Sequence, residues 1–254
     1  MNTHPFWKLA ALTLSLSAPA ALASEWRDEG NLRRDDVESE EEREQSAEDR
    51  GFNLGLRVGY GLPVGNAVGA PDGGEAGKLS DAVSGVIPLQ LDVGYSFNSN
   101  LALGAYFQYG LGMLAEDCVD GADCSVRQLR FGVNLTYHFL PGAKLRPWLG
   151  LGVGYEKLNV TASASEAGES IDITTSIHGF EFASVQGGLD YRINERFSVG
   201  PYLMVTAAMY STTSISVDSS IDSPIFDEME ESEGIDDKAV HLWPMAGVRM
   251  QFHF

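Results

Sequence analysis

The chain has 254 residues and a formal net charge of −19, and its 17 lysines and arginines form no basic stripe. An acidic surface repels phosphates, so no nucleic-acid partner is expected. With 28 glycines and 10% aromatic residues, the composition instead favours a β architecture with many turns.

The first 23 residues have the features of a secretory signal peptide. Lys8 precedes the apolar run from Leu9 to Leu16, and small residues lead to a small-x-small cleavage motif before Ser24. This run is shorter than the ~18 residues that a membrane-spanning helix needs, and no later stretch reaches that length. We therefore expect an exported chain that starts near Ser24.

Residues 24–50 are predicted to be a disordered acidic leader. From Glu25 to Arg50 there are 12 acidic and 5 basic residues, a net charge of −7. With one aromatic residue and few large aliphatic ones, the segment cannot bury enough apolar surface to offset the entropy of ordering it. A docking role for this leader is the alternative interpretation. The folded domain is expected to comprise residues 51–254.

From Gly51 onward, apolar and polar residues alternate with the period of a β-strand. In residues 129–139 every odd position is large and apolar, and every even position is polar or glycine. The parity of the bulky residues slips near residues 180–185, which predicts a β-bulge. Eight segments are predicted as strands: 51–62, 86–97, 101–113, 129–139, 147–160, 177–193, 197–212 and 239–254.

The predicted connections alternate between short and long. Residues 98–100, 140–146 and 194–196 are short links, whereas 63–85, 114–126, 161–176 and 213–238 are long and polar. In an up-and-down meander, alternate connections lie on the same side of the sheet, so one rim has tight turns and the other has long loops. Three prolines lie within predicted strands, a few residues from an end: Pro88, Pro201 and Pro244. Proline has no backbone N–H to donate to the neighbouring strand, and this loss is best tolerated near a strand end.

The two faces of the predicted strands indicate a membrane barrel. A soluble eight-stranded barrel turns its apolar face inward. Here the polar face combines long side chains with glycines, which leave room for those side chains inside a narrow barrel. The apolar face has aromatic residues at both ends and aliphatic residues between them, as the two interfaces of a bilayer select. The predicted fold is therefore all-β: an eight-stranded antiparallel up-and-down transmembrane β-barrel.

The terminal segment from Val248 to Phe254 alternates to its last position and ends on an aromatic residue. Together with the eight strands, it resembles the small eight-stranded outer-membrane β-barrel proteins of Gram-negative bacteria, the OmpA/OmpX-like superfamily. The resemblance covers residues 51–254, the barrel domain only; the peptidoglycan-binding domain of OmpA-type members is expected to be absent. In this family, Met250, Phe252 and Phe254 would belong to the signal that the barrel assembly machinery recognises.

The resemblance also has consequences for location and partners. It implies a cell outer-membrane location, a periplasmic leader, short periplasmic turns and long extracellular loops. The expected partners are outer-membrane lipid and lipopolysaccharide, and the expected oligomeric state is a monomer. No cofactor is expected, and the sequence does not name an extracellular ligand.

Charged residues on the polar face are predicted to lie inside the barrel. Counting from the strand ends places Arg57, Asp92 and Arg249 at similar depth on neighbouring strands, and Arg130 level with Glu156. An unpaired buried charge is very costly, so these groups are expected to form ion pairs. An ionic plug that opens transiently for small ions or solutes is the alternative. A wide pore is not expected, because side chains fill an eight-stranded barrel.

The two cysteines, Cys118 and Cys124, flank a short loop that contains a glycine. In an exported protein this arrangement predicts a disulfide. A metal site formed by Asp117, Asp120 and Asp123 is the alternative, although the spacing matches no calcium-loop pattern.

The last long link is acidic, with nine acidic residues and one basic residue between Thr213 and Lys238. Carboxylate oxygens are ligands of hard divalent cations, so this link is a candidate site for cations that bridge lipopolysaccharide phosphates. A solvated charge run is the alternative. The candidate residues are Asp227, Glu228, Glu230, Glu231, Glu233, Asp236 and Asp237.

Ser176, His178 and Glu181 lie near the expected outer rim, where a lipid-modifying hydrolase would place its triad. A Ser and a His two positions apart are expected by chance in a Ser-rich segment, so no catalytic residue is predicted. The sequence favours a structural or surface-interaction role. A narrow gated channel is the first alternative, and a lipid-modifying enzyme is the second.

Overall fold

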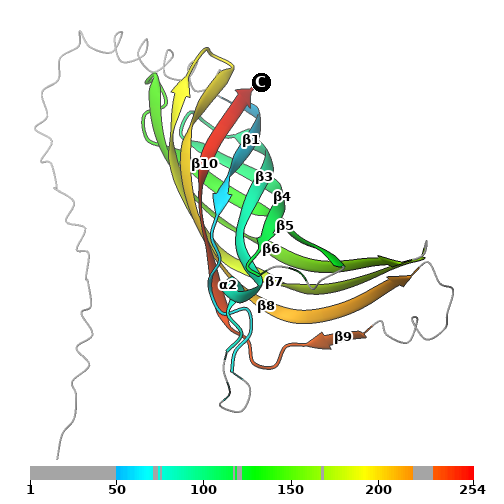
Figure 1. Cartoon of the computed structure of the whole chain (residues 1–254). Helices are drawn as coiled ribbons and strands as arrows, with labels where there is room; N and C mark the ends of the chain where they lie inside the picture. Colours follow the sequence, from blue (N-terminus) through cyan, green and yellow to red (C-terminus); the bar gives the residue numbers. More distant parts are fainter. Residues whose placement is uncertain are drawn as a thin grey trace, which may run out of the picture. The chain divides into compact units, whose positions relative to one another are not determined.

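Eight long antiparallel strands close into a barrel (Figure 1). The computed structural model describes residues 50–70, 74, 76–116, 118, 122–166, 169–219 and 231–254. The predicted signal peptide and nearly all of the predicted leader lie outside these residues. The ring consists of β1 (Gly51–Gly61), β3 (Val83–Ser96), β4 (Leu101–Leu114), β5 (Ala122–His138), β6 (Leu145–Glu166), β7 (Glu169–Arg192), β8 (Phe197–Ser219) and β10 (Val240–His253).

The last strand closes the ring. β10 pairs with β1 along nine residue pairs from Asn53↔His253 to Gly61↔Met245, and on its other side it pairs with β8. The backbone N–H of Phe254 also donates to the carbonyl oxygen of Phe52 at 2.9 Å. A closed ring leaves no unpaired edge to face lipid, and the predicted barrel fold is confirmed.

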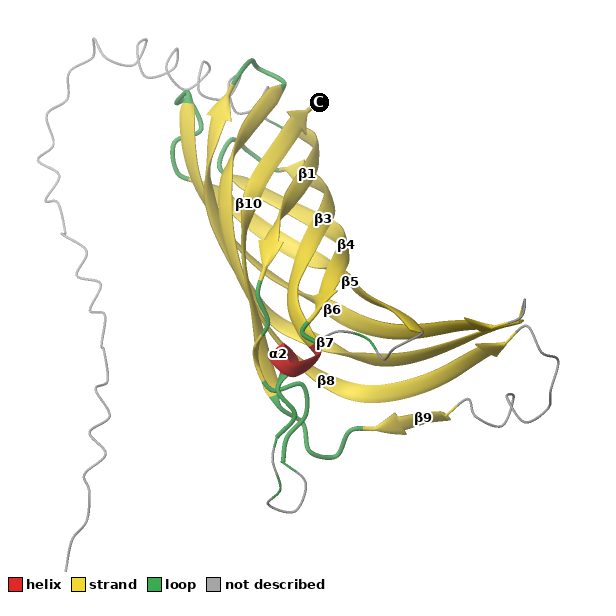
Figure 2. Cartoon of the chain, in the orientation of Figure 1, coloured by secondary structure: helices red, strands yellow, loops and turns green. Residues whose placement is uncertain are grey.

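Three short elements lie at the long-loop end of the barrel (Figure 2). β2 (Val64–Gly65) pairs with β10, β9 (Glu231–Gly234) pairs with β8, and α2 (Leu79–Ala82) is a single helical turn before β3. Across the described ranges, no helix is long and apolar enough to cross a membrane.

The polarity of the ring is the reverse of that of a soluble protein. Large aliphatic side chains face outward, as with Leu203 at 68% and Leu151 at 62% exposure, whereas Arg57, Arg130 and Glu156 are fully buried inside. Outside the ring, aromatic side chains contact one another near the short-turn ends of the strands and again about halfway along β5 and β6. They include Phe52 with Tyr95 at a centroid distance of 5.4 Å and Phe131 with Tyr155 at 5.6 Å. This is the pattern of an apolar band between two aromatic girdles.

Three strands are much longer than a bilayer requires. β6, β7 and β8 have 22, 24 and 23 residues, whereas a transmembrane strand needs about 9 to 11. Their outer parts extend past the other strands and curve sideways (Figure 1). We call residues 161–166, 169–176, 211–219 and β9 the extension sheet. The prediction that residues 161–176 and the start of 213–238 form loops is wrong, because their Ser, Thr, Ile and Val residues alternate and sustain strand pairing.

Bulges and prolines interrupt the ladders locally. The pairing of β7 with β8 shifts at residues 178–179 and 181–183, which is the region where the sequence predicts a bulge. The pairing of β1 with β3 skips residues 59–60, opposite Pro88. The pairing of β7 with β8 skips residues 189–190, opposite Pro201. A proline has no N–H to donate to the ladder, so pairing weakens at these positions without breaking the ring.

Candidate functional site

The lumen is filled by side chains that interact in layers, and the layer around Arg57 crosses it. Arg57 on β1 donates from Nε to Asp92 Oδ2 at 2.7 Å and from Nη2 to Asp92 Oδ1 at 3.1 Å. Its Nη1 donates to Gln186 on β7. Asp92 also accepts from Gln90 at 2.9 Å and from Asn134 at 3.3 Å. This Arg57 cluster links four strands, β1, β3, β5 and β7, through buried polar groups.

A second layer, the Arg130 cluster, lies around the ion pair of Arg130 with Glu181. Arg130 donates to Glu181 Oε2 from Nε at 2.9 Å and from Nη2 at 2.5 Å, and from Nη1 to Gln108 at 3.1 Å. The hydroxyl of Tyr106 donates to Glu181 Oε1 at 3.1 Å. Gly154 makes room for Tyr106, since a Cβ there would lie 2.3 Å from the Tyr106 hydroxyl.

The expected ion pair of Arg130 with Glu156 does not form. The two residues are Cα partners on β5 and β6, as expected, but Arg130 forms its ion pair with Glu181 on β7. Depth along adjacent strands predicts which side chains are level. It does not predict which acceptor a long guanidinium reaches. The parity rule also misses Glu181, because the pairing of β7 is irregular between Glu181 and Ala183 and the alternation shifts there.

Glu156 is at the centre of the third layer, the Glu156 cluster. Its Oε1 accepts from Gln128 at 3.1 Å, from the Tyr210 hydroxyl at 2.6 Å and from the Trp243 indole at 2.9 Å. His241 Nε2 lies 3.6 Å from Oε2. Three donors on one oxygen stabilise a buried carboxylate that has no arginine of its own.

Arg249 belongs to a layer nearer the short-turn end, the basal layer. Its partner is Asp190 on β7, at 3.5 Å, and not Asp92. The indole of Trp148 donates to Asp190 at 3.1 Å, and the guanidinium of Arg249 lies 4.2 Å from the Trp148 ring centroid. Asp190 lies inside the barrel like Gln186, four positions earlier on the same strand, as alternation predicts, but its pairing with Arg249 is not predicted from the sequence.

An apolar cap lies at the long-loop end of the lumen. Leu79 of α2 is 1% exposed and packs with Val83 and Val86 of β3, Val126 of β5 and Leu158 of β6. The first long link therefore contributes a side chain to the interior. From the basal layer to the apolar cap, the lumen contains interlocked side chains.

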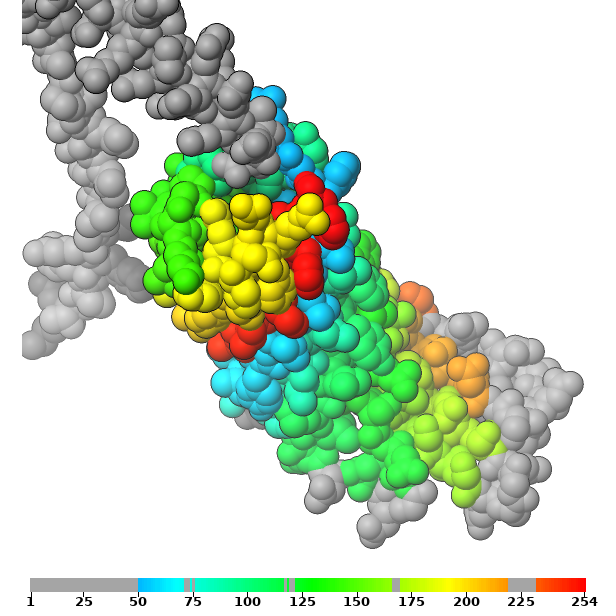
Figure 3. Space-filling model, turned by 90° about the horizontal axis from the view of Figure 1, so that it is seen from above, coloured from blue at the N-terminus to red at the C-terminus, as the bar shows by residue number. Residues whose placement is uncertain are grey.

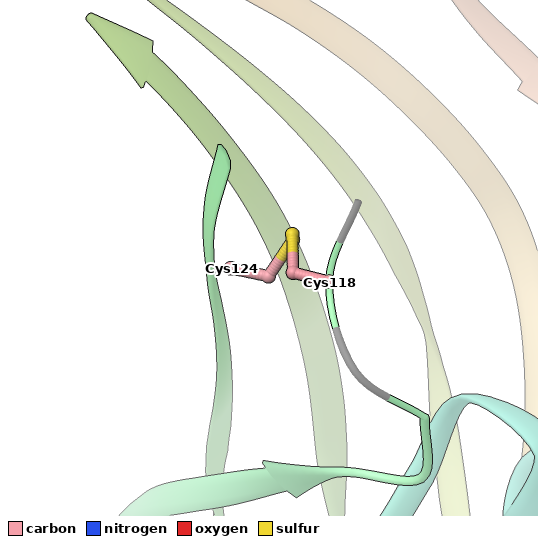
Figure 4. Close-up of a disulfide and its surroundings, with 2 residues drawn as sticks. All are labelled: Cys118 and Cys124. Carbon is pink, nitrogen blue, oxygen red and sulfur yellow. A yellow bond between two sulfur atoms is a disulfide. The ribbon is translucent and has the colours of Figure 1, made fainter. Parts of the chain in front are cut away.

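The predicted disulfide between Cys118 and Cys124 is confirmed (Figure 4). It joins the two sides of the β4–β5 connection, with a Cα–Cα distance of 5.7 Å. Of the alternative metal ligands, Asp117 and Asp120 lie outside the described residues. Among the residues that the structure describes, no group of His, Cys, Asp or Glu is arranged to hold a metal ion.

The predicted cation-binding residues of the last link are only partly described. Asp227, Glu228 and Glu230 lie outside the described residues, as does the side chain of Glu231. Glu233 is in β9, and Asp236 and Asp237 follow it. The cation site therefore stays a prediction.

The candidate triad residues do not converge. Glu181 faces the lumen and is bound to Arg130, whereas the ring of His178 lies 5.8 Å from that of Tyr155, which belongs to the outward-facing aromatic residues. His178 and Glu181 are three positions apart in β7, so their side chains point to opposite faces of the wall. Ser176, His178 and Glu181 therefore form no nucleophile–base–acid arrangement.

The comparison with protein families agrees with this geometry. A model described as "Outer membrane protein beta-barrel domain" matches residues 88–215, just over half of the chain. The protein belongs to this outer-membrane β-barrel family. It is an outer-membrane protein, and in barrels of this type the short turns face the periplasm and the long loops face outward.

No curated protein matches the sequence significantly. Solved structures with a similar fold include Neisserial surface protein A, with 12% identity, a TM-score of 0.46 and coverage of 80% of this chain and 97% of that chain. They also include OprG from Pseudomonas aeruginosa, with 17% identity, a TM-score of 0.45 and coverage of 81% and 98%. Ail from Yersinia pestis has 14% identity and a TM-score of 0.38, with coverage of 80% and 99%.

Proposed function

We propose that this outer-membrane barrel is a closed scaffold that presents its extension sheet to surfaces outside the cell. The observation that carries the proposal is the filled lumen. The basal layer, the Arg57 cluster, the Arg130 cluster and the Glu156 cluster follow one another inside the ring, and the apolar cap covers the outer end. A lumen occupied in this way supports a structural role for the barrel wall rather than transport.

The extension sheet supports the second half of the proposal. It adds strand pairing beyond the length that a bilayer requires, as far as the pair Glu166↔Glu169 at the tip of β6 and β7. One face carries Ile173 and Ile215, both more than two-fifths exposed, and the other carries Thr161 and Thr174, whose hydroxyls lie 3.0 Å apart. An amphipathic sheet outside the membrane, with β9 covering only part of the β8 edge, is suited to contact with a macromolecular surface.

The closed state is tested by conductance of the mature protein in a planar bilayer. A silent membrane that contains the inserted barrel is the expected result. Frequent discrete openings of the wild-type protein would contradict a closed scaffold. The surface role is tested separately, by comparing adherence to epithelial monolayers of cells producing the wild-type protein or a variant with residues 163–173 replaced by a two-residue turn. Equal adherence with equal surface levels would contradict the surface role.

A narrow gated channel is the second candidate, and one observation favours it. The polar layers are built from single side chains of different strands, so they can rearrange without opening the hydrogen-bonded wall. On this hypothesis Arg57, Asp92, Arg130, Glu156 and Arg249 form the gate. Arg57→Ala and Asp92→Ala would then produce longer or larger openings than the wild type in the same bilayer experiment.

The proposed partners are outer-membrane lipid, lipopolysaccharide and the barrel assembly machinery. The apolar band would contact outer-membrane lipid, and the outer aromatic girdle would contact lipopolysaccharide. The protein would be a monomer. The assembly machinery would recognise the terminal strand. In this strand Phe252 faces outward and packs against Phe197, with 4.7 Å between the two ring centroids. Met250 and Phe254 complete this signal. The proposal includes no catalytic role.

A further inference from the structure

A cavity opens at the periplasmic end of the barrel, below the basal layer. Its volume is about 770 Å³, and we call it the basal vestibule. Figure 3 views this end, where the start of β1, the β5–β6 turn, the β7–β8 turn and the end of β10 gather. These segments are drawn in blue, green, yellow and red. The vestibule is therefore built by residues that are far apart in the sequence and that the closed ring brings together.

Basic side chains dominate its lining. The set is four arginines and two histidines: Arg50, Arg146, Arg192, Arg196, His138 and His253. Glu195 is the one acidic side chain among the described lining residues, so arginine side chains outnumber acidic side chains four to one. Asp190, deeper in the lumen, is already bound to Arg249 and Trp148.

The layers above do not share this imbalance. Arg57 pairs with Asp92, and Arg130 pairs with Glu181. The buried Glu156 adds a negative charge next to His241. Among the described residues of the lumen, the surplus of positive charge therefore lies at the periplasmic opening, where a soluble molecule can reach it.

The vestibule also contains donor groups that protein acceptors do not use up. His138 is 5% exposed, and its Nε2 has no hydrogen-bond partner, since Asp190 Oδ2 is 3.8 Å away. Arg192 uses one N–H on the carbonyl of Pro141, at 2.5 Å, out of the five that a guanidinium offers. Ser96 adds a hydroxyl to the wall, which accepts from Asn53 Nδ2 at 3.2 Å.

We propose that the basal vestibule is a binding site for a small soluble anion that carries two or more carboxylate or phosphate groups. Guanidinium groups bind such groups through paired, charge-assisted hydrogen bonds. Several arginines around one cavity favour a ligand with more than one anionic group. The buried side chains of His138 and Arg146 place the inner part of the site within the ring of strands, so the proposed ligand comes from the periplasm and not from the surrounding lipid.

The test uses the mature protein in nanodiscs of zwitterionic phosphatidylcholine, with inorganic pyrophosphate and citrate as probes. Binding is followed by calorimetry and by backbone amide chemical shifts. Arg196→Gln and Arg192→Gln remove one guanidinium each. The Arg196 side chain is exposed and makes no hydrogen bond or ion pair among the described residues, so this variant keeps the fold. Arg127→Gln is the matched control, because Arg127 is an exposed arginine of β5 near the opposite end of the barrel.

The expected result is saturable binding, with changes in backbone amide chemical shift confined to the periplasmic turns. Each vestibule variant is expected to bind about tenfold more weakly, as the loss of a charge-assisted hydrogen bond implies. The Arg127→Gln variant is expected to match the wild type. Absence of saturable binding, or equal weakening by all three substitutions, would overturn the proposal. A third outcome would also overturn the proposal: chemical-shift changes at these turns that need no soluble probe and appear only in nanodiscs containing anionic phosphatidylglycerol. The occupant would then be a lipid headgroup.

Discussion

Arg57 and Arg249 are directly opposed Cα partners on β1 and β10, yet each guanidinium binds a different carboxylate. Arg57 binds Asp92, and Arg249 binds Asp190. The ring of Trp148 lies beside both guanidinium groups, with centroid distances of 5.5 Å to Arg57 and 4.2 Å to Arg249. Two like charges at the seam that closes the barrel are therefore tolerated because each has its own acceptor and both contact one aromatic ring.

Removal of either partner of the Arg57–Asp92 pair should strongly destabilise the barrel. Arg57→Ala leaves Asp92 buried without its arginine, and Asp92→Ala leaves the arginine uncompensated, at an expected cost of about 3 to 5 kcal/mol in the free energy of unfolding. The double variant Arg57→Leu, Asp92→Leu should lose less than either single change. Urea unfolding of the protein in lipid or detergent measures all three, and additive losses in the double variant would contradict this account.

The choice of Glu181 over Glu156 as the partner of Arg130 predicts a difference in coupling. Double-mutant cycles with Arg130→Met should give a coupling energy of about 2 kcal/mol with Glu181→Gln and a smaller one with Glu156→Gln. The reason is that two short hydrogen bonds join Arg130 to Glu181, whereas Glu156 takes its donors from Gln128, Tyr210 and Trp243. Equal coupling with both glutamates would show that the ion pair is shared.

The disulfide should stabilise the β4–β5 connection more than the barrel. It closes a loop across a sequence separation of six, which corresponds to about 2 kcal/mol in the chain-entropy model. Cys118→Ser with Cys124→Ser should keep the barrel ladder and speed amide exchange at the outer ends of β4 and β5. Hydrogen exchange by mass spectrometry checks this, with β1 and β10 as the internal reference. Faster exchange throughout the ring would mean that the bond stabilises the whole fold.

The sequence predicts the wall of this barrel better than its contents. Alternation assigns the inward and outward faces, as Leu129 and Arg130 show on adjacent positions, because a bilayer outside and a packed lumen inside impose opposite polarities. It fails for the extension sheet, where Ile171 and Ile173 alternate with polar residues that resemble a loop. It fails again for Glu181, because a bulge removes the parity on which the rule depends. Contacts across the lumen join strands far apart in the ring, so local spacing carries no information about them.

The packing of Tyr106 against Gly154 gives a prediction with a matched control. A Cβ at position 154 would lie 2.3 Å from the Tyr106 hydroxyl and 2.6 Å from the carbonyl oxygen of Phe131, whereas a Cβ at Gly142 meets nothing within 4 Å. Gly154→Ala should therefore destabilise the barrel by about 1 to 3 kcal/mol, since either Tyr106 or the strand backbone must move. Gly142→Ala, in the β5–β6 turn, should change the stability by less than about 0.5 kcal/mol.

Tyr106 also holds Glu181, so its displacement has a second consequence. Because the Tyr106 hydroxyl donates to Glu181, the Gly154→Ala change should also weaken the Arg130–Glu181 pair. The Tyr106→Phe, Gly154→Ala double variant removes the 2.3 Å contact and should recover part of the stability that Gly154→Ala loses. Urea midpoints of the four proteins measure this. If the double variant is less stable than Gly154→Ala, the hydroxyl is not the group that the new methyl displaces, and the strain lies in the β5–β6 backbone.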